Sequence, residues 1–194
     1  KGLTELPEHA VIGTSSRRRT LQMERLCPGC TFRGIRGNVQ TRMRKLEEEG
    51  YDATLLAAAG LKRLGMEHAA GRYLSVEEMI PAAGQGILAV QGRRDMDCGW
   101  IHRVDDPASR AAALAERQFI RVLGGGCTSP SAAHAEVNGN ELRLTGLCWS
   151  EKSEQYARGV LCGDVSRAEQ VGEALAERLR REACRVPIRD SAAR

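Results

Sequence analysis

The chain has 194 residues, 42% of them hydrophobic, and a net charge of +4, which is typical of a soluble globular protein with one large or two small domains. No apolar run approaches the length that spans a bilayer, and Lys1 to Pro7 lack the apolar core of a signal peptide, so we expect neither membrane insertion nor secretion. We therefore expect a protein of the cytoplasm, or of the stroma in a plastid-bearing organism.

The first part of the chain alternates short apolar runs with helical patterns. We expect strands at Ala10–Gly13, Phe32–Arg36 and Asp52–Ala58. A first helix should follow Thr14–Ser16, whose hydroxyls can cap it, and a second should run from Val39 to Glu49, with Asn38 as its N-cap and Gly50 at its end. A third helix should start at Leu61. Apart from Asp52 and Thr54 the third run is apolar, as is a strand covered on both faces. This order predicts an α/β domain with a doubly wound, mainly parallel sheet, of the kind found in periplasmic binding proteins.

The last part of the chain has a different pattern. The expected elements are a helix from Asp106-Pro107 to Leu123, strands at Ala133–Val137, Glu141–Leu147 and Tyr156–Leu161, and a helix that opens with the capping box Ser166–Glu169 and buries Val171, Leu175 and Leu179. Asn138-Gly139 between two alternating runs is the strongest short-range signal for a hairpin. We expect a small α+β domain, in which an antiparallel three-stranded sheet carries helices on one face.

A segment between these two parts, Ile80 to Gln91, fits neither pattern. Its apolar run Ile87–Val90 indicates a buried strand, but no neighbouring part of the sequence offers that strand a partner.

Positive charge is concentrated in the first part of the chain. Nine basic residues and one acidic residue lie between Val11 and Lys45, and the rest of the chain has 20 basic and 24 acidic residues. The clusters at Gly13–Arg19 and Arg33–Arg42 each follow an expected strand and open a helix, where free backbone N–H groups and guanidinium groups favour anions. Both junctions lie at the carboxyl edge of a parallel sheet, where ligands bind. The alternative is a solvated basic helix face.

Cys127 lies in the sequence Gly124-Gly125-Gly126-Cys127-Thr128-Ser129-Pro130. Three glycines before the thiol remove the side chains that would shield it, so a bulky group can reach the sulfur. The alternative is a glycine-rich connection with an incidental cysteine.

The other cysteines and the histidines give weaker signals. The chain has seven cysteines with irregular spacing, which do not form a disulfide framework, and we expect reduced thiols. Cys27-Pro28-Gly29-Cys30 has the spacing of a redox or metal site, but no second pair completes a zinc site, so we favour two thiols in a surface turn and expect no metal. His134 is interpreted as a structural residue.

Taken together, these motifs resemble the porphobilinogen deaminase family, also called hydroxymethylbilane synthase. The matching segments are Val11–Ser16 with Arg18-Arg19, Ile35–Val39 with Thr41-Arg42, Ala59–Gly65, Pro81–Gly86 and Gly125–Cys127. Each segment alone is a weak signal, but the five occur in order and with the family's spacing over almost the whole chain.

The resemblance implies a transferase of tetrapyrrole biosynthesis that condenses porphobilinogen units head to tail and releases ammonia. Cys127 matches the cysteine that carries the dipyrromethane cofactor through a thioether. The implied cofactor-binding residues are Thr14, Ser16, Arg18, Arg19, Arg36, Gly37 and Arg42, and the implied substrate-binding residues are Arg18, Arg36, Arg42, Arg63 and Gln85. Each pyrrole carries carboxylates, for which dense arginine is the chemical counterpart.

The resemblance also implies a domain that should precede Lys1, and this domain carries the family's catalytic aspartate. We expect residues 1–82 to form the middle α/β domain, residues 83–105 to return to that preceding domain, and residues 106–194 to form the C-terminal α+β domain. No residue of this chain is assigned the aspartate's role, so we expect the chain to be inactive alone and to need its N-terminal domain, whether separate or attached. The full-length enzyme is expected to be monomeric.

Two other functions are compatible with the same residues. One is a non-enzymatic module that uses the arginine junctions to bind a small polycarboxylate or phosphate. The other is nucleic-acid binding by the basic stretch, but only Phe32 accompanies these arginines as an aromatic residue, which argues against base stacking.

Overall fold

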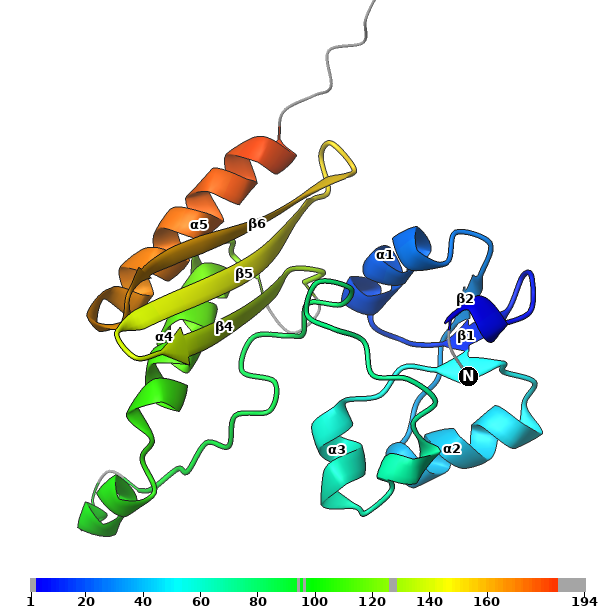
Figure 1. Cartoon of the computed structure of the whole chain (residues 1–194), viewed down its shortest axis with the longest axis horizontal. Coiled ribbons are helices and arrows are strands. Elements are labelled where there is room, and N and C mark those ends of the chain that lie inside the picture. The colour runs from blue at the N-terminus through cyan, green and yellow to red at the C-terminus, as the bar shows by residue number, and fades with distance from the viewer. Residues whose placement is uncertain (1–2, 94, 96, 126–128, 185–194) are drawn as a thin grey trace, which may run out of the picture. The chain divides into compact units, whose positions relative to one another are not determined.

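A computed structural model describes residues 3–93, 95, 97–125 and 129–184. They form two compact units: the first contains the described residues up to Pro81 together with Ser129 and Pro130, and the second contains the other described residues. The first unit contains a parallel sheet and the second an antiparallel sheet (Figure 1). No helix among the described residues is long and apolar enough to cross a membrane.

The first unit is built on a parallel sheet of three short strands in the order β2-β1-β3. The strands are β1 (Val11–Gly13), β2 (Thr31–Arg33) and β3 (Ala53–Thr54), and the helices are α1 (Arg17–Leu26), α2 (Val39–Glu48) and α3 (Ala58–Arg63), with 3₁₀ turns at Leu3–Glu5 and Glu67–Ala69. Ile12, Met23 and Ile35, each 1% exposed, form the core of this unit. The predicted parallel α/β order is therefore confirmed.

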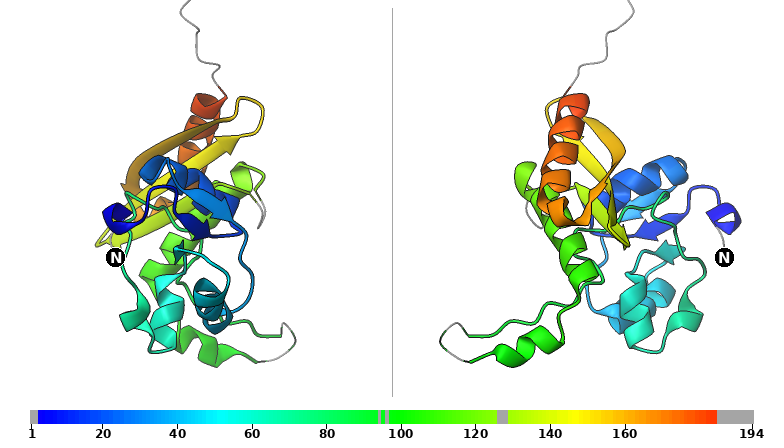
Figure 2. Two further views of the ribbon diagram at one scale, coloured as in Figure 1. Left: turned by 90° about the vertical axis from the view of Figure 1, so that its right-hand side faces the viewer. Right: turned by 60° about the vertical axis from the view of Figure 1, so that its left-hand side comes forward.

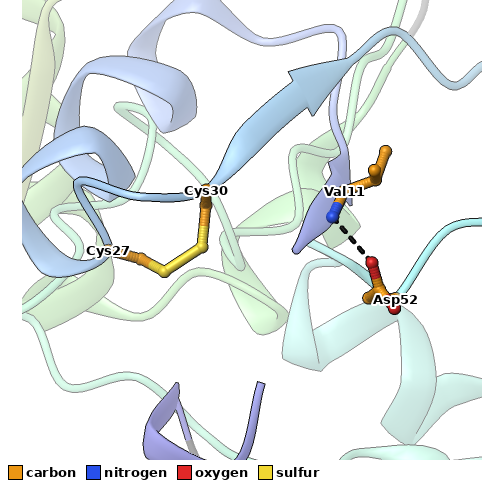
Figure 3. The surroundings of a disulfide bond; sticks show 4 residues. All are labelled: Val11, Cys27, Cys30 and Asp52. Carbon is orange, nitrogen blue, oxygen red and sulfur yellow. Dashed lines mark hydrogen bonds between the residues drawn. A yellow bond between two sulfur atoms is a disulfide. The ribbon is translucent and has the colours of Figure 1, made fainter. Parts of the chain in front are cut away.

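Local hydrogen bonds hold the ends of these elements. Asn38 caps α2, as predicted, because its side chain accepts a hydrogen bond from the Thr41 N–H at 2.8 Å. The central strand starts at Val11, whose N–H donates to the Asp52 carboxylate at 2.7 Å (Figure 3). The prediction of a hydroxyl cap on α1 was wrong for Ser16, whose side chain makes no cap hydrogen bond. The Thr14 hydroxyl accepts from the Ser16 N–H instead, at 3.2 Å.

Two strands of the first unit are shorter than predicted. β2 ends at Arg33, and β3 covers only Ala53–Thr54 because α3 begins at Ala58, three residues before the predicted start. The alanines that made this stretch look like a buried strand are also the strongest helix formers, and here they open a helix.

The second unit packs two long helices against one face of an antiparallel sheet (Figure 2). Its elements are α4 (Pro107–Val122), β4 (Ala132–Asn138), β5 (Glu141–Ser150), β6 (Gln155–Asp164) and α5 (Ala168–Ala183), with 3₁₀ turns at Gly99–Arg103 and Val165–Arg167. The strand order is β4-β5-β6. The core includes Phe119 of α4, Leu144 of β5 and Leu175 and Leu179 of α5, all 0% exposed. The α+β prediction is confirmed.

The hairpin turn lies one residue later than predicted. Asn138 pairs with Glu141, so the two loop residues are Gly139 and Asn140. Gly139 has a φ of +59°, and a two-residue turn that needs a positive φ at its first position favours glycine there.

The predicted capping box of α5 does not form. α5 begins at Ala168, and its preceding 3₁₀ turn is capped by Asp164, whose carboxylate accepts from both the backbone N–H and the hydroxyl of Ser166. An ionised acceptor two residues before Ser166 is the stronger partner, so the serine hydroxyl becomes a donor.

The buried strand predicted at Ile87–Val90 is also wrong. The structure shows no strand at these residues, and Leu88 and Val90 are 76% and 50% exposed. A strand needs a neighbour for its backbone groups, and no strand among the described residues pairs with this segment.

Candidate anion-binding site

The two strand-to-helix junctions of the first unit lie side by side. β1 and β2 are parallel neighbours with Gly13 opposite Arg33, so the segments that follow them emerge at the same edge of the sheet. The Ser15 hydroxyl donates to the Ile35 carbonyl at 3.0 Å and thereby joins the two segments directly. The prediction that the sheet brings the two basic clusters to one edge is confirmed.

Three of the predicted arginines are held by backbone carbonyls. Arg18 Nη1 donates to the Ile80 carbonyl at 2.8 Å, Arg19 Nη1 to the Leu55 carbonyl at 2.9 Å, and Arg42 Nε to the Gly37 carbonyl at 2.8 Å. None of the three forms an ion pair with an acidic residue among those the structure describes. Each guanidinium is therefore oriented without being neutralised.

These arginines affect one another electrostatically. Burial and, to a smaller extent, the positive charge of Arg19 together lower the pKa of Arg18 to about 10. The pKa of Arg19 is lowered mainly by burial and then by Arg42. A guanidinium with a pKa of about 10 is still charged at neutral pH. Arg18, Arg19 and Arg42 thus gather positive charge at these junctions without an acidic partner among the described residues, which is the property of an anion site.

The other predicted residues of the first unit are placed as follows. Arg36 and Arg63 are exposed and have no hydrogen bond or ion pair with any described residue. Thr14 is 6% exposed, and its hydroxyl oxygen is used by the Ser16 N–H. Gly37 has a φ of +122° and supplies the carbonyl that holds Arg42.

Two predicted residues are not part of this arrangement. Gln85 is an exposed residue of the second unit. Cys127 lies outside the described residues.

Arg33, although part of the second basic cluster, packs against its own unit. Its guanidinium lies 3.9 Å from the centroid of the Tyr51 ring and donates to the carbonyls of Glu49 and Gly50. These contacts give Arg33 a structural role.

The buried side chains of Gln22 and Glu116, which bind backbone groups, were not predicted from the sequence. Gln22, one turn after Arg18 on α1, is 5% exposed. Glu116, 3% exposed on α4, accepts hydrogen bonds from the N–H groups of Gly84 at 2.5 Å and Ala135 at 2.7 Å. Their spacing was a usable signal, because Gln22 follows Arg18 by four residues, and Glu116 lies between Ala115 and Phe119, both of which are 0% exposed.

His134 and Glu116 form a further polar pair in the second unit. His134 Nδ1 lies 3.7 Å from the Glu116 carboxylate. Burial raises the pKa of Glu116, and the two backbone N–H donors and His134 oppose this effect.

The expectation of reduced thiols was wrong for Cys27 and Cys30. Their sulfur atoms form a disulfide across a tight turn between α1 and β2 (Figure 3). The turn brings the two Cα atoms to 5.5 Å, which is within the span of a disulfide. No group of three or more His, Cys, Asp or Glu side chains in the described part of the chain could hold a metal ion.

Family models match both units of the chain. Residues 1–98 match the model described as "Porphobilinogen deaminase, dipyromethane cofactor binding domain". Residues 111–181 match the model described as "Porphobilinogen deaminase, C-terminal domain". The chain belongs to the porphobilinogen deaminase family. Arg18, Arg19 and Arg42 all fall within the model named for the cofactor, and Cys127 falls within the C-terminal model.

Curated relatives named porphobilinogen deaminase agree with this assignment. The relative from Acetivibrio thermocellus is 44% identical over 91% of this chain and 60% of its own length. The relative from Roseiflexus castenholzii is 46% identical over 91% of this chain and 59% of its own length, and that from a Nostoc species is 43% identical over 94% and 57%. The chain thus spans about three fifths of the length of these porphobilinogen deaminases.

Proposed function

We propose that this chain forms the cofactor-binding and C-terminal parts of a cytoplasmic porphobilinogen deaminase. The enzyme would condense porphobilinogen units onto a dipyrromethane linked to Cys127 and release ammonia at each addition. Residues 1–82 would be the middle domain, with the fold of a periplasmic-binding-protein domain. Residues 83–105 would form a connecting segment that returns to the N-terminal domain, and residues 106–194 would form the C-terminal domain.

The observation that supports this proposal is that three arginines, Arg18, Arg19 and Arg42, have no acidic partner in the described part of the chain. Arg18, Arg19 and Arg42 are held by the carbonyls of Ile80, Leu55 and Gly37. A guanidinium whose partner is a neutral carbonyl keeps its full charge and several N–H donors for a ligand. Porphobilinogen and its oligomers carry an acetate and a propionate on every ring, so this donor set fits the cofactor and the growing chain.

The roles follow from this chemistry. Arg18, Arg19, Arg36 and Arg42 would bind carboxylates of the cofactor, helped by Thr14, Ser16 and Gly37. The contacts to substrate would come from Arg18, Arg36, Arg42, Arg63 and Gln85. The dipyrromethane would supply the nucleophilic pyrrole carbon to which the first unit is joined, and each added unit would supply that carbon for the next. Orientation of substrate by several fixed donors lowers the entropic cost of the condensation. The acid that assists loss of ammonia would come from the part of the enzyme that lies outside this chain, whether as a separate chain or not.

Complementation tests this proposal. The 194-residue chain is mixed with the N-terminal part of the Acetivibrio thermocellus relative that it does not match, and porphobilinogen consumption is measured together with the intact mass. We expect little turnover by the chain alone, turnover by the mixture, and an added mass that peptide mapping places on Cys127.

The control is Cys127→Ser, which should abolish both the added mass and the turnover without changing the melting temperature. An adduct on another cysteine, or turnover by the Cys127→Ser mixture, would overturn the assignment of Cys127.

A further inference from the structure

The side-chain amide of Gln22 binds the backbone of Ile80 through both of its polar atoms. Gln22 Oε1 accepts from the Ile80 N–H at 2.8 Å, and Gln22 Nε2 donates to the Ile80 carbonyl at 3.0 Å. Gln22 Nε2 also donates to the carbonyl of Arg18 at 3.3 Å. Gln22 is 5% exposed and Ile80 is fully buried, so water does not replace these bonds.

Only an amide can satisfy this arrangement. Ile80 presents one donor and one acceptor to the same side chain, and the second hydrogen of Nε2 is used by Arg18. A glutamate at position 22 could accept from the Ile80 N–H but could donate nothing. An apolar residue of the same length would leave a buried N–H without a partner, which is costly.

The Ile80 carbonyl that Gln22 fixes is the same carbonyl that holds Arg18. This oxygen accepts from Gln22 Nε2 and from Arg18 Nη1, at 3.0 Å and 2.8 Å. Ile80 is 62 residues from Arg18 in the sequence, and Gln22 ties it to the same helix. The guanidinium of Arg18 is thus oriented by an acceptor whose own position is set by Gln22.

We propose that Gln22 is a positioning residue of the arginine site: it fixes the Ile80 carbonyl, and that carbonyl turns Arg18 so that its remaining N–H donors meet a ligand carboxylate. Gln22 itself does not contact the ligand. The inference rests on the proposed function, because it needs Arg18 to bind a carboxylate. It assigns the buried glutamine a role in affinity in addition to packing.

A double-mutant cycle on the 194-residue chain tests this role. The probe is a linear tetrapyrrole with acetate and propionate side chains, and its dissociation constant is measured for the wild type, Gln22→Met, Arg18→Lys and the double variant. We expect Gln22→Met to weaken binding by about tenfold, the size of a lost charge-assisted hydrogen bond. In the Arg18→Lys background Gln22→Met should have almost no further effect, because its effect passes through Arg18.

The control for lost stability is Leu21→Ala, which removes a buried apolar side chain from the same helix and should leave the affinity within about twofold of the wild type at a temperature where the protein is folded. Gln22→Glu provides a second variant that keeps one hydrogen bond and should also weaken binding. If Gln22→Met and Gln22→Glu bind like the wild type, or if the effects of Gln22→Met and Arg18→Lys multiply, the positioning role is wrong. If the wild type does not bind the probe, or if Arg18→Lys binds as well as the wild type, the proposed carboxylate site itself is wrong and the role of Gln22 falls with it.

Discussion

Arg19 of α1 donates a hydrogen bond of 2.9 Å from Nη1 to the carbonyl of Leu55, the residue that follows β3. This bond ties the first helix to the far edge strand of the parallel sheet and at the same time orients the guanidinium. Arg18 and Arg42 are held by carbonyls in the same way.

A carboxylate would hold these arginines more strongly but would also compete with an anionic ligand. A carbonyl provides direction without charge, so the positive potential remains available for binding. The cost is that neighbouring cations are partly buried without neutralisation, which is visible in the lowered pKa values of Arg18 and Arg19. Binding of an anion would offset this cost.

Replacing Arg42 by lysine should weaken binding of a linear tetrapyrrole. An ammonium cannot donate through Nε to the Gly37 carbonyl and present a planar pair of donors to a carboxylate at the same time, so we expect a loss of about 1 to 3 kcal/mol in binding free energy. Arg36→Lys should act in the same direction.

The matched control is Arg44→Lys on the same helix. Arg44 is exposed and paired with Glu48 at 3.6 Å, and its replacement should change the affinity by less than about 0.5 kcal/mol. The affinities are measured by calorimetry. If Arg42→Lys, Arg36→Lys and the wild type bind equally well, the basic cluster is a solvated surface and not a carboxylate site.

Gly37→Ala should destabilise the first unit and disturb the site. Gly37 has a φ of +122°, and a Cβ added there would lie 2.6 Å from Thr41 Cγ2, so both the backbone and the packing oppose a side chain. We expect a loss of about 1 to 3 kcal/mol in the free energy of unfolding, together with weaker ligand binding because the Gly37 carbonyl holds Arg42.

Gly29→Ala serves as the comparison. No atom lies within 4 Å of a Cβ built on Gly29, and its φ is not in the left-handed region, so the free energy of unfolding should change by less than about 0.5 kcal/mol. Urea denaturation of both variants measures these free energies of unfolding. Equal losses for Gly37→Ala and Gly29→Ala would show that the backbone conformation and packing of Gly37 are not the cause.

Reducing the Cys27–Cys30 disulfide should lower stability modestly. The bond closes a four-residue turn between α1 and β2. Cross-linking so short a loop lowers the conformational entropy of the unfolded chain, which stabilises the folded state by about 2 kcal/mol. The double variant Cys27→Ser/Cys30→Ser should lose that amount and should no longer respond to reductant. Labelling of thiols in the denatured, unreduced chain should leave Cys27 and Cys30 unmodified, and their full labelling would contradict the disulfide.

Elements with strong local signals were predicted closely from the sequence. The helix that starts at Pro107 was correct because Asp106 caps it, accepting from the Ser109 N–H at 2.8 Å, and its apolar positions have a clear helical period. The hairpin was correct to within one residue because the turn chemistry is local. Elements that depend on distant partners were not predicted closely, as the exposed run Ile87–Val90 shows.

The candidate site was predictable to a similar extent. The repeated pattern of a strand followed by arginines indicated an anion site at one sheet edge, and the sheet topology brings the two clusters there. The carbonyl partners were not predictable, because Arg18 and Gln22 meet Ile80 across 62 and 58 residues of sequence. Nothing local to Ile80 distinguishes its carbonyl from any other.

The buried carboxylate of Glu116 should give the second unit a defined pH dependence. Burial raises the pKa of Glu116 above its ordinary value of 4.5, so the folded state binds a proton more readily than the unfolded state does. Stability therefore falls as pH rises from about 4.5 through the raised pKa. The group that faces this carboxylate is His134, 3.7 Å away, and its protonation opposes the shift.

The test compares urea unfolding of the wild type and Glu116→Gln between about pH 4 and about pH 7. Glutamine does not titrate, so the free energy of unfolding of the wild type minus that of Glu116→Gln should decrease as pH rises. Repeating both measurements in a His134→Gln background removes the charge that opposes the shift and should enlarge the decrease. A difference that stays constant, or that increases with pH, would mean that the two backbone N–H donors of Gly84 and Ala135 outweigh burial and that the pKa of Glu116 is not raised.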